Sequence, residues 1–275
     1  MQTVVASEAA NQSAANQSAA PLEDWIEKFH RDGFLVLHDV LPPELVQQLR
    51  DDLDRALDGP DSAGPPIVQR NQHLELRTRI FEVSRANLSL FDREPIVSFA
   101  EALIAPDCHV IHNNSFRTPP GSGISIWHQD DPPHLLVTHG EAPTNIRLPV
   151  LLFSANYYLS DATEVEHGPT EVVPGSHLFG APCPRTLEGT KYQERAVSCS
   201  GKAGSVVMFN NQVWHRGAPN QSERTRYVTQ VSYARRLIGH KYFPFMNYQM
   251  PEHVYAGADA RLKRLLGFLP TGNYG

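Results

Sequence analysis

The hydrophobic pattern along the chain changes character about a third of the way through. Residues 21–33 place three apolar side chains on one helical face before a closing glycine, and residues 42–59 place four leucines at helical spacing. Both patterns predict amphipathic helices. After about residue 105 the chain consists of short β-rich runs separated by Pro, Gly and Asn. Several short strands at close spacing favour a β-sandwich or barrel over alternating β-α units.

These elements predict an all-β core with flanking helices, folded as a double-stranded β-helix, the jelly roll of cupin-like proteins. We expect a single domain over residues 21–275. Its parts are N-terminal helices at 21–60, a jelly-roll core at about 105–236 and a C-terminal segment at 237–275. Residues 1–20 repeat the motif ANQSAA and offer little to pack against, so they predict a disordered tail.

The composition excludes several classes of protein. A hydrophobic fraction of 41% and a charged fraction of 20% are typical of a soluble globular chain. The net charge is −6 and the basic residues are scattered, which argues against a nucleic-acid partner. We find no secretory signal and no apolar run near the roughly 20 residues of a membrane helix. Three cysteines without a C-x-x-C pair favour the reduced thiols of a cytoplasmic protein.

The stretch IWHQDD at 126–131 contains the first candidate chemistry. Side chains alternate along a strand, so His128 and Asp130 point to the same face and can occupy adjacent positions on one divalent metal ion. His215, which follows the strand-like run GSVVMFN, is the candidate third ligand. Two histidines and one carboxylate leave open coordination sites, the arrangement of non-haem Fe(II) oxygenases. Open sites indicate catalysis rather than a structural metal.

Arg226 lies eleven residues after His215, at the head of the next β-rich run. A guanidinium is always charged and binds carboxylates in a planar, bidentate manner. Beside a metal with open sites, it suits the far carboxylate of a dicarboxylic co-substrate whose other end chelates the ion. This arrangement indicates 2-oxoglutarate.

The order of WHQDD, HGPTEVVPGSH at 167–177 and GSVVMFNNQVWHRGAPNQSERTR resembles the phytanoyl-CoA dioxygenase family of Fe(II)/2-oxoglutarate oxygenases. The opening FHRDGFLVLHDVLPPELVQQLRDDLD also resembles that family, so the likeness covers about residues 22–236. It implies that His128, Asp130 and His215 bind iron and that Arg226 pairs with 2-oxoglutarate.

The resemblance also implies co-substrate contacts from Asn114 or Arg117, in the run IHNNSFRTPPGSG that precedes the metal motif. The family often has a lysine just before the double proline, where this chain has Thr118. Related halogenating enzymes have a small residue in place of the metal carboxylate, so that chloride can bind. The retained Asp130 therefore favours hydroxylation or another oxidation.

Our hypothesis is an enzyme that uses Fe(II), 2-oxoglutarate and O2 to oxidise an unactivated C–H bond of a small organic molecule, most simply by hydroxylation. Succinate and CO2 are released. His134, in a loop near the metal motif, and Arg147 are candidate substrate contacts. The substrate is open between a CoA thioester, an amino-acid-like molecule and a secondary metabolite.

Two other functions remain as alternatives. One is a non-catalytic metal-binding jelly roll, such as a sensor or scaffold, and the other is a metal-dependent isomerase or hydrolase. The helix-like run ADARLKRLLGF at 258–268 has one apolar face, which fits either a docked helix or a dimer contact. Both a monomer and a homodimer are therefore compatible with the sequence.

Overall fold

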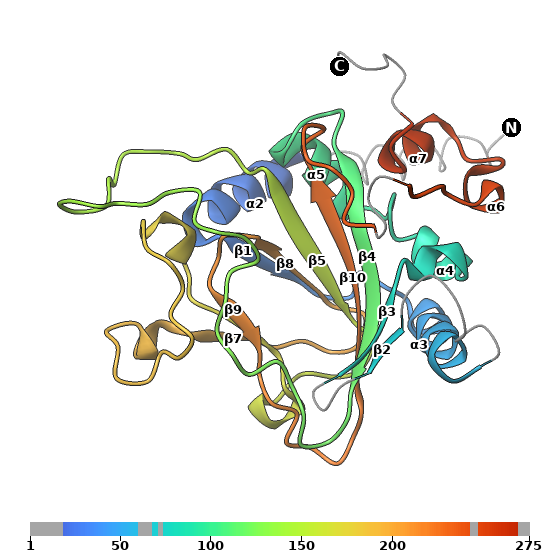
Figure 1. Ribbon diagram of the computed structural model, residues 1–275, viewed down its shortest axis with the longest axis horizontal. Helices are drawn as coiled ribbons and strands as arrows, with labels where there is room; N and C mark the ends of the chain where they lie inside the picture. Colours follow the sequence, from blue (N-terminus) through green and yellow to red (C-terminus); the bar gives the residue numbers. More distant parts are fainter. Residues whose placement is uncertain (1–18, 60–67, 71–73, 243–246, 269–275) are drawn as a thin grey trace, which may run out of the picture.

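The computed structural model describes residues 19–59, 68–70, 74–242 and 247–268. Two antiparallel sheets face each other (Figure 1). Apolar side chains from both sheets meet between them. The larger sheet has the order β1 (Phe34–Leu37), β8 (Val206–Asn210), β5 (Leu152–Tyr158), β10 (Arg226–Ala234), β4 (His109–Thr118), β3 (Glu75–Thr78) and β2 (Val68–Arg70). The smaller sheet has the order β7 (Val197–Cys199), β6 (Thr170–Val172) and β9 (His215–Gly217).

The helices lie outside the sheets, as the sequence predicted. They are α2 (Ala19–Asp32), α3 (Pro43–Asp58), α4 (Arg85–Leu88), α5 (Ile96–Leu103), α6 (Glu252–Tyr255) and α7 (Ala260–Leu265). Short 3-10 turns are η2 (Ile80–Glu82), η3 (Val165–His167), η4 (Ser176–Leu178) and η5 (Gln193–Arg195). Helix α2 begins two residues inside the stretch predicted as a disordered tail, and the rest of that stretch, 1–18, lies outside the described residues.

The main core lies between the larger sheet and the helices. In α3, Leu49, Leu53 and Leu57 are buried, which is the leucine face that predicted this helix. From α2, the ring of Phe29 packs 5.7 Å from that of Phe153 on β5. This packing covers one face of the larger sheet and leaves its other face to line the space between the sheets.

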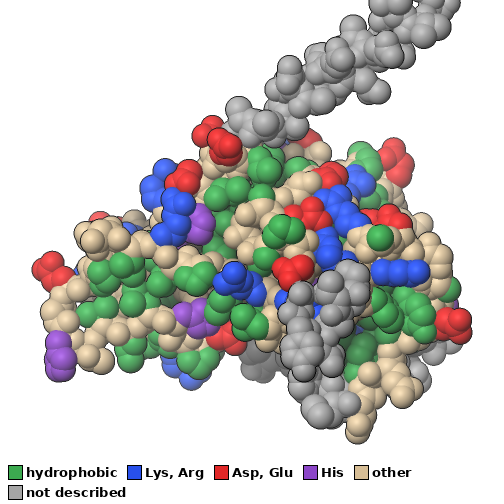
Figure 2. All heavy atoms as spheres, turned by 90° about the horizontal axis from the view of Figure 1, so that it is seen from above, with side chains coloured by type: hydrophobic (Ala, Val, Ile, Leu, Met, Phe, Trp, Pro, Cys, Tyr) green, Lys and Arg blue, Asp and Glu red, His purple; other side chains and the backbone are tan. Residues whose placement is uncertain are grey.

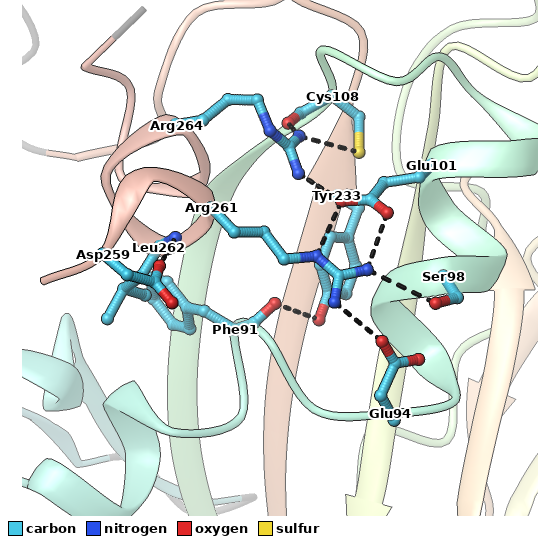
Figure 3. A network of polar contacts seen from close by, with 10 residues as sticks. All are labelled: Phe91, Glu94, Ser98, Glu101, Cys108, Tyr233, Asp259, Arg261, Leu262 and Arg264. Carbon is cyan, nitrogen blue, oxygen red and sulfur yellow. Dashed lines mark hydrogen bonds and ion pairs between the residues drawn. The ribbon is translucent and has the colours of Figure 1, made fainter.

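The C-terminal helix α7 is docked on α5 by a network of ion pairs (Figure 3). Arg261 pairs with Glu101 at 2.6 Å and with Glu94 at 2.7 Å, and Arg264 also reaches Glu101. Leu265 on the same helix is fully buried in the main core. The apolar face of this segment is therefore used in intramolecular docking, the first of the two alternatives left by the sequence.

The surface and the thiols agree with the composition. On the face seen in Figure 2, acidic and basic side chains are intermingled and form no large patch of one sign. The three cysteines, all within the described part of the chain, are free thiols. Among the helices of the described ranges, none has the length and apolar character needed to cross a bilayer.

Candidate metal and co-substrate site

Three potential metal ligands meet between the two sheets. The segment around His128 lies beside β9 and exchanges two backbone hydrogen bonds with His215, of 2.8 and 3.0 Å. The backbone N–H of Asp130 donates to the carbonyl of Asn211 at 2.9 Å. These bonds bring the ligand atoms of His128, Asp130 and His215 within 4.8 Å of one another. The structure therefore assembles the two-histidine, one-carboxylate group predicted from the sequence.

Both histidine rings are oriented by backbone carbonyls. The Nδ1 atom of His128 lies 3.0 Å from the carbonyl oxygen of Ile126, and Nδ1 of His215 lies 2.8 Å from that of Val213. An Nδ1–H that donates to a carbonyl leaves the Nε2 lone pair free for a metal. Burial lowers the pKa of His215, although Asp130 opposes this effect. A neutral imidazole, the form that binds metal, is favoured.

Arg226 is a buried cation that has no acidic partner among the described residues. Its side chain is only 6% exposed, and burial lowers the pKa of the guanidinium. Nη1 donates a hydrogen bond to the carbonyl of Gly168, whereas Nε has no hydrogen-bond partner among the described residues. Because an unpaired buried charge is costly, this arrangement fits a ligand that brings a carboxylate.

The metal cluster and Arg226 line one cavity of about 220 Å³. Drug-sized ligands occupy pockets of roughly 300–1,000 Å³, so this cavity suits smaller molecules. The guanidinium lies 5.9 Å from the centre of the Phe116 ring. A Cβ atom on Gly217 would lie 3.2 Å from Nη2 of Arg226, so the glycine allows the guanidinium to approach β9 closely.

The two residues of β4 that were predicted to contact the co-substrate point to opposite faces of the larger sheet. Asn114 lines the cavity. Arg117 does not, and this prediction is wrong: its guanidinium pairs with Asp54 at 2.7 Å, Asp58 at 2.7 Å and Glu75 at 2.5 Å. The physical reason is strand geometry, since residues three apart on one strand point to opposite faces. Arg117 therefore faces α3, outside the space between the sheets.

The predicted substrate contacts are not brought to this cavity. Arg147 is 57% exposed, pairs with Glu27 of α2 at 2.5 Å and does not line the metal cavity. His134 lines a separate cavity of about 230 Å³, together with Leu148 and Gln212. Its backbone N–H donates to Gln212 Oε1 at 2.7 Å.

Asn156 and Gln230 also line the metal cavity and were missed by the sequence analysis. Gln230 lies four residues after Arg226 on β10, so strand alternation alone places both side chains on one face. For Asn156 the sequence carried no such signal. Its place beside Gln230 depends on the pairing of β5 with β10.

The fold is a double-stranded β-helix. HygX from Streptomyces hygroscopicus, solved with nickel, 2-oxoglutarate and hygromycin B, superposes with a TM-score of 0.61 at 16% identity, covering 78% of this chain and 86% of HygX. The epimerase SnoN, solved with Fe3+, alpha ketoglutarate and nogalamycin RO, gives a TM-score of 0.62 at 17% identity, covering 87% of this chain and 93% of SnoN. The predicted fold class is confirmed.

The family model for phytanoyl-CoA dioxygenase (PhyH) matches residues 29–228, and the chain belongs to this family. Dioxygenase cdmA of Talaromyces verruculosus is 26% identical over 215 residues, which is 74% of this chain and 69% of the relative. An ectoine dioxygenase of Nocardia farcinica is 23% identical over 231 residues, 72% of each chain. The predicted family, enzyme class and cofactors, iron and 2-oxoglutarate, are confirmed.

Proposed function

We propose that this enzyme hydroxylates an unactivated C–H bond of a small organic molecule and releases succinate and CO2. One observation carries the proposal: a single small cavity is lined by both the His128–Asp130–His215 cluster and the buried Arg226. A non-catalytic metal-binding scaffold has no use for a desolvated guanidinium beside its metal site. A dicarboxylic co-substrate uses both.

Each residue has a distinct task in this proposal. His128, Asp130 and His215 hold the iron, and Arg226 binds the far carboxylate of 2-oxoglutarate. Phe116 and Leu76, which both line the cavity, flank the carbon chain of the co-substrate and exclude water from it. When bound, the iron supplies the redox chemistry that couples decarboxylation of 2-oxoglutarate to oxidation of the substrate by O2.

Hydroxylation is proposed over halogenation because the carboxylate of Asp130 is present and directed at the metal cluster. Its Oδ1 atom lies 3.6 Å from Nε2 of His215. A carboxylate that occupies this metal-ligand position leaves no room there for a halide. The volume of about 220 Å³ further supports a small substrate, or a small reacting part of a larger one.

Succinate formation tests the proposal without knowledge of the substrate. Wild-type protein supplied with Fe(II), 2-oxoglutarate and O2 should form succinate slowly, and His215→Ala should form none above background. Arg147→Ala is the matched control, since it removes an exposed arginine outside the cavity. Metal-dependent turnover of a substrate without 2-oxoglutarate would identify the isomerase or hydrolase alternative. A wild-type protein that binds iron but forms no succinate would favour the scaffold.

A further inference from the structure

Three carboxamide side chains form a straight row across the larger sheet. Gln230 on β10 is the direct cross-strand partner of Asn114 on β4 and of Asn156 on β5. All three line the cavity that contains the metal cluster. Gln230 Nε2 donates to Asn156 Oδ1 at 2.9 Å, and Asn114 Oδ1 is buried without a hydrogen-bond partner among the described residues. We call these three residues the carboxamide row.

A second polar row lies two residues further along the same strands. It consists of His112, Ser232 and Ser154, which are again cross-strand partners. The hydroxyl oxygens of Ser154 and Ser232 are 2.9 Å apart, and His112 hydrogen-bonds Gln230. Burial lowers the pKa of His112 to about 4, so its ring is neutral at neutral pH. Both rows are therefore polar and uncharged.

The carboxamide row lies at the end of the cavity away from the co-substrate anchor. On β10, Gln230 follows Arg226 by four residues, a distance of roughly 13 Å along a strand. Between them, Val228 and its cross-strand partner Phe116 form an apolar pair. This apolar pair lies between Arg226 and the carboxamide row. A co-substrate held by Arg226 would therefore lie against the apolar pair, and the carboxamides would face the opposite end of the cavity.

The charged side chains that line the cavity either have an ion-pair partner or belong to the proposed metal and co-substrate sites. Asp130 belongs to the metal cluster, Arg226 binds the co-substrate, and Arg216 pairs with Glu171 at 2.6 Å. Lys241, which also lowers the pKa of His112, is exposed and is not among the lining residues. A charged group placed against the two polar rows would lose its water without gaining a counter-charge.

We propose that the carboxamide row is the substrate-recognition surface and that it selects a substrate whose reacting part is uncharged and carries hydroxyl or carbonyl groups. A carboxamide offers both donors and an acceptor, so a row of three matches groups that donate and accept in turn. The unpartnered Oδ1 of Asn114 provides an acceptor for a substrate hydroxyl, so the proposal assigns Asn114 to the substrate in place of the co-substrate contact predicted from the sequence. The inference rests on the proposed function, because it assigns the other end of the cavity to 2-oxoglutarate.

The test uses matched neutral and charged probes. Methyl α-D-glucopyranoside is compared with its 6-carboxylate and 6-phosphate, and 2-pyrrolidone is compared with 5-oxoproline. Binding is measured by saturation-transfer NMR on the iron-free protein and by the shift of the visible band of the anaerobic Fe(II)–2-oxoglutarate complex. The variants are Gln230→Leu and Asn156→Leu, and the control is Gln47→Leu, an exposed glutamine on α3.

The neutral member of each pair should bind, and its charged counterpart should bind at least about tenfold more weakly. Gln230→Leu and Asn156→Leu should weaken the neutral probes about tenfold, as expected for lost hydrogen bonds, while the affinity for 2-oxoglutarate stays within about twofold. A retained Fe(II)–2-oxoglutarate band shows that each variant is folded.

Three results would overturn the assignment. The first is tighter binding of the charged members, and the second is failure of every neutral probe to bind. The third is equal weakening of 2-oxoglutarate and neutral-probe binding in Gln230→Leu, which would show that the carboxamide row binds the co-substrate. Failure of the proposed function looks different, because the wild type would then lack the Fe(II)–2-oxoglutarate band before any probe is added.

Discussion

Replacing Arg226 with methionine should separate the stability of the fold from the binding of 2-oxoglutarate. Methionine is a shorter, unbranched side chain that carries no charge. In the absence of 2-oxoglutarate the change removes a buried cation that has no acidic partner in the described part of the chain, which favours the folded state. It also leaves the Gly168 carbonyl without its donor, which costs about 1–3 kcal/mol. Because the two effects oppose each other, the free energy of unfolding without 2-oxoglutarate should change little.

Binding of 2-oxoglutarate should respond much more strongly. Loss of one partner of a buried, hydrogen-bonded charge pair costs about 2–5 kcal/mol, which raises the Kd about 30-fold or more. A ligand at one hundred times its Kd stabilises a protein by about 2.7 kcal/mol. With the Kd raised 30-fold, the same ligand concentration stabilises Arg226→Met by only about 0.9 kcal/mol.

The assay is urea unfolding with and without 2-oxoglutarate, with nickel in place of iron so that no turnover occurs. Arg147→Met serves as the control, since it removes an exposed arginine outside the cavity and should keep the full ligand-induced stabilisation. The reasoning fails if Arg226→Met keeps that stabilisation, or if it loses several kcal/mol when 2-oxoglutarate is absent.

Three further changes test other parts of the structure. Arg117→Met removes a guanidinium with three partly exposed carboxylate partners, so the free energy of unfolding in urea should fall by about 1–2 kcal/mol, and by less at high salt. A decrease that is the same at low and high salt would contradict this. Gly217→Ala puts a Cβ 3.2 Å from Nη2 of Arg226, and calorimetry should show 2-oxoglutarate affinity reduced severalfold rather than unchanged. Burial alone would raise the pKa of Glu101, but Arg261 and Arg264 on α7 outweigh this effect and lower the pKa. The stabilisation from Glu101 is therefore present above its usual pKa of about 4.3 and lost as pH falls below it, so acid titrations of wild type and Glu101→Gln should converge at low pH and not diverge.

The metal cluster was accessible from the sequence because its signals are local. His128 and Asp130 are two residues apart, and alternation along an extended chain keeps them on one face whether or not a regular strand forms. In the structure this segment pairs with β9 only through the isolated bridge between His128 and His215, yet both side chains contribute to the metal cluster. Arg226 was accessible for a similar reason, since it begins a strand and has a fixed spacing from the last ligand.

Two residues predicted to contact the co-substrate or the substrate, Arg117 and Arg147, lie outside the metal cavity. Asn114 and Arg117 are three apart, so alternation already assigned them to opposite faces, and only one lines the cavity. Arg147 lies in a long irregular segment whose path depends on tertiary contacts such as its ion pair with Glu27. The carboxamide row depends on the register of three strands far apart in sequence, which no local pattern encodes.

The most direct test of the account is the visible absorbance of the anaerobic protein on adding Fe(II) and then 2-oxoglutarate. The wild type should develop a weak metal-to-ligand charge-transfer band. His215→Ala should show no band, and Arg226→Ala should need a much higher concentration of 2-oxoglutarate to develop it. A wild-type protein that shows no band at any concentration would contradict the claim that this cavity holds iron and 2-oxoglutarate together.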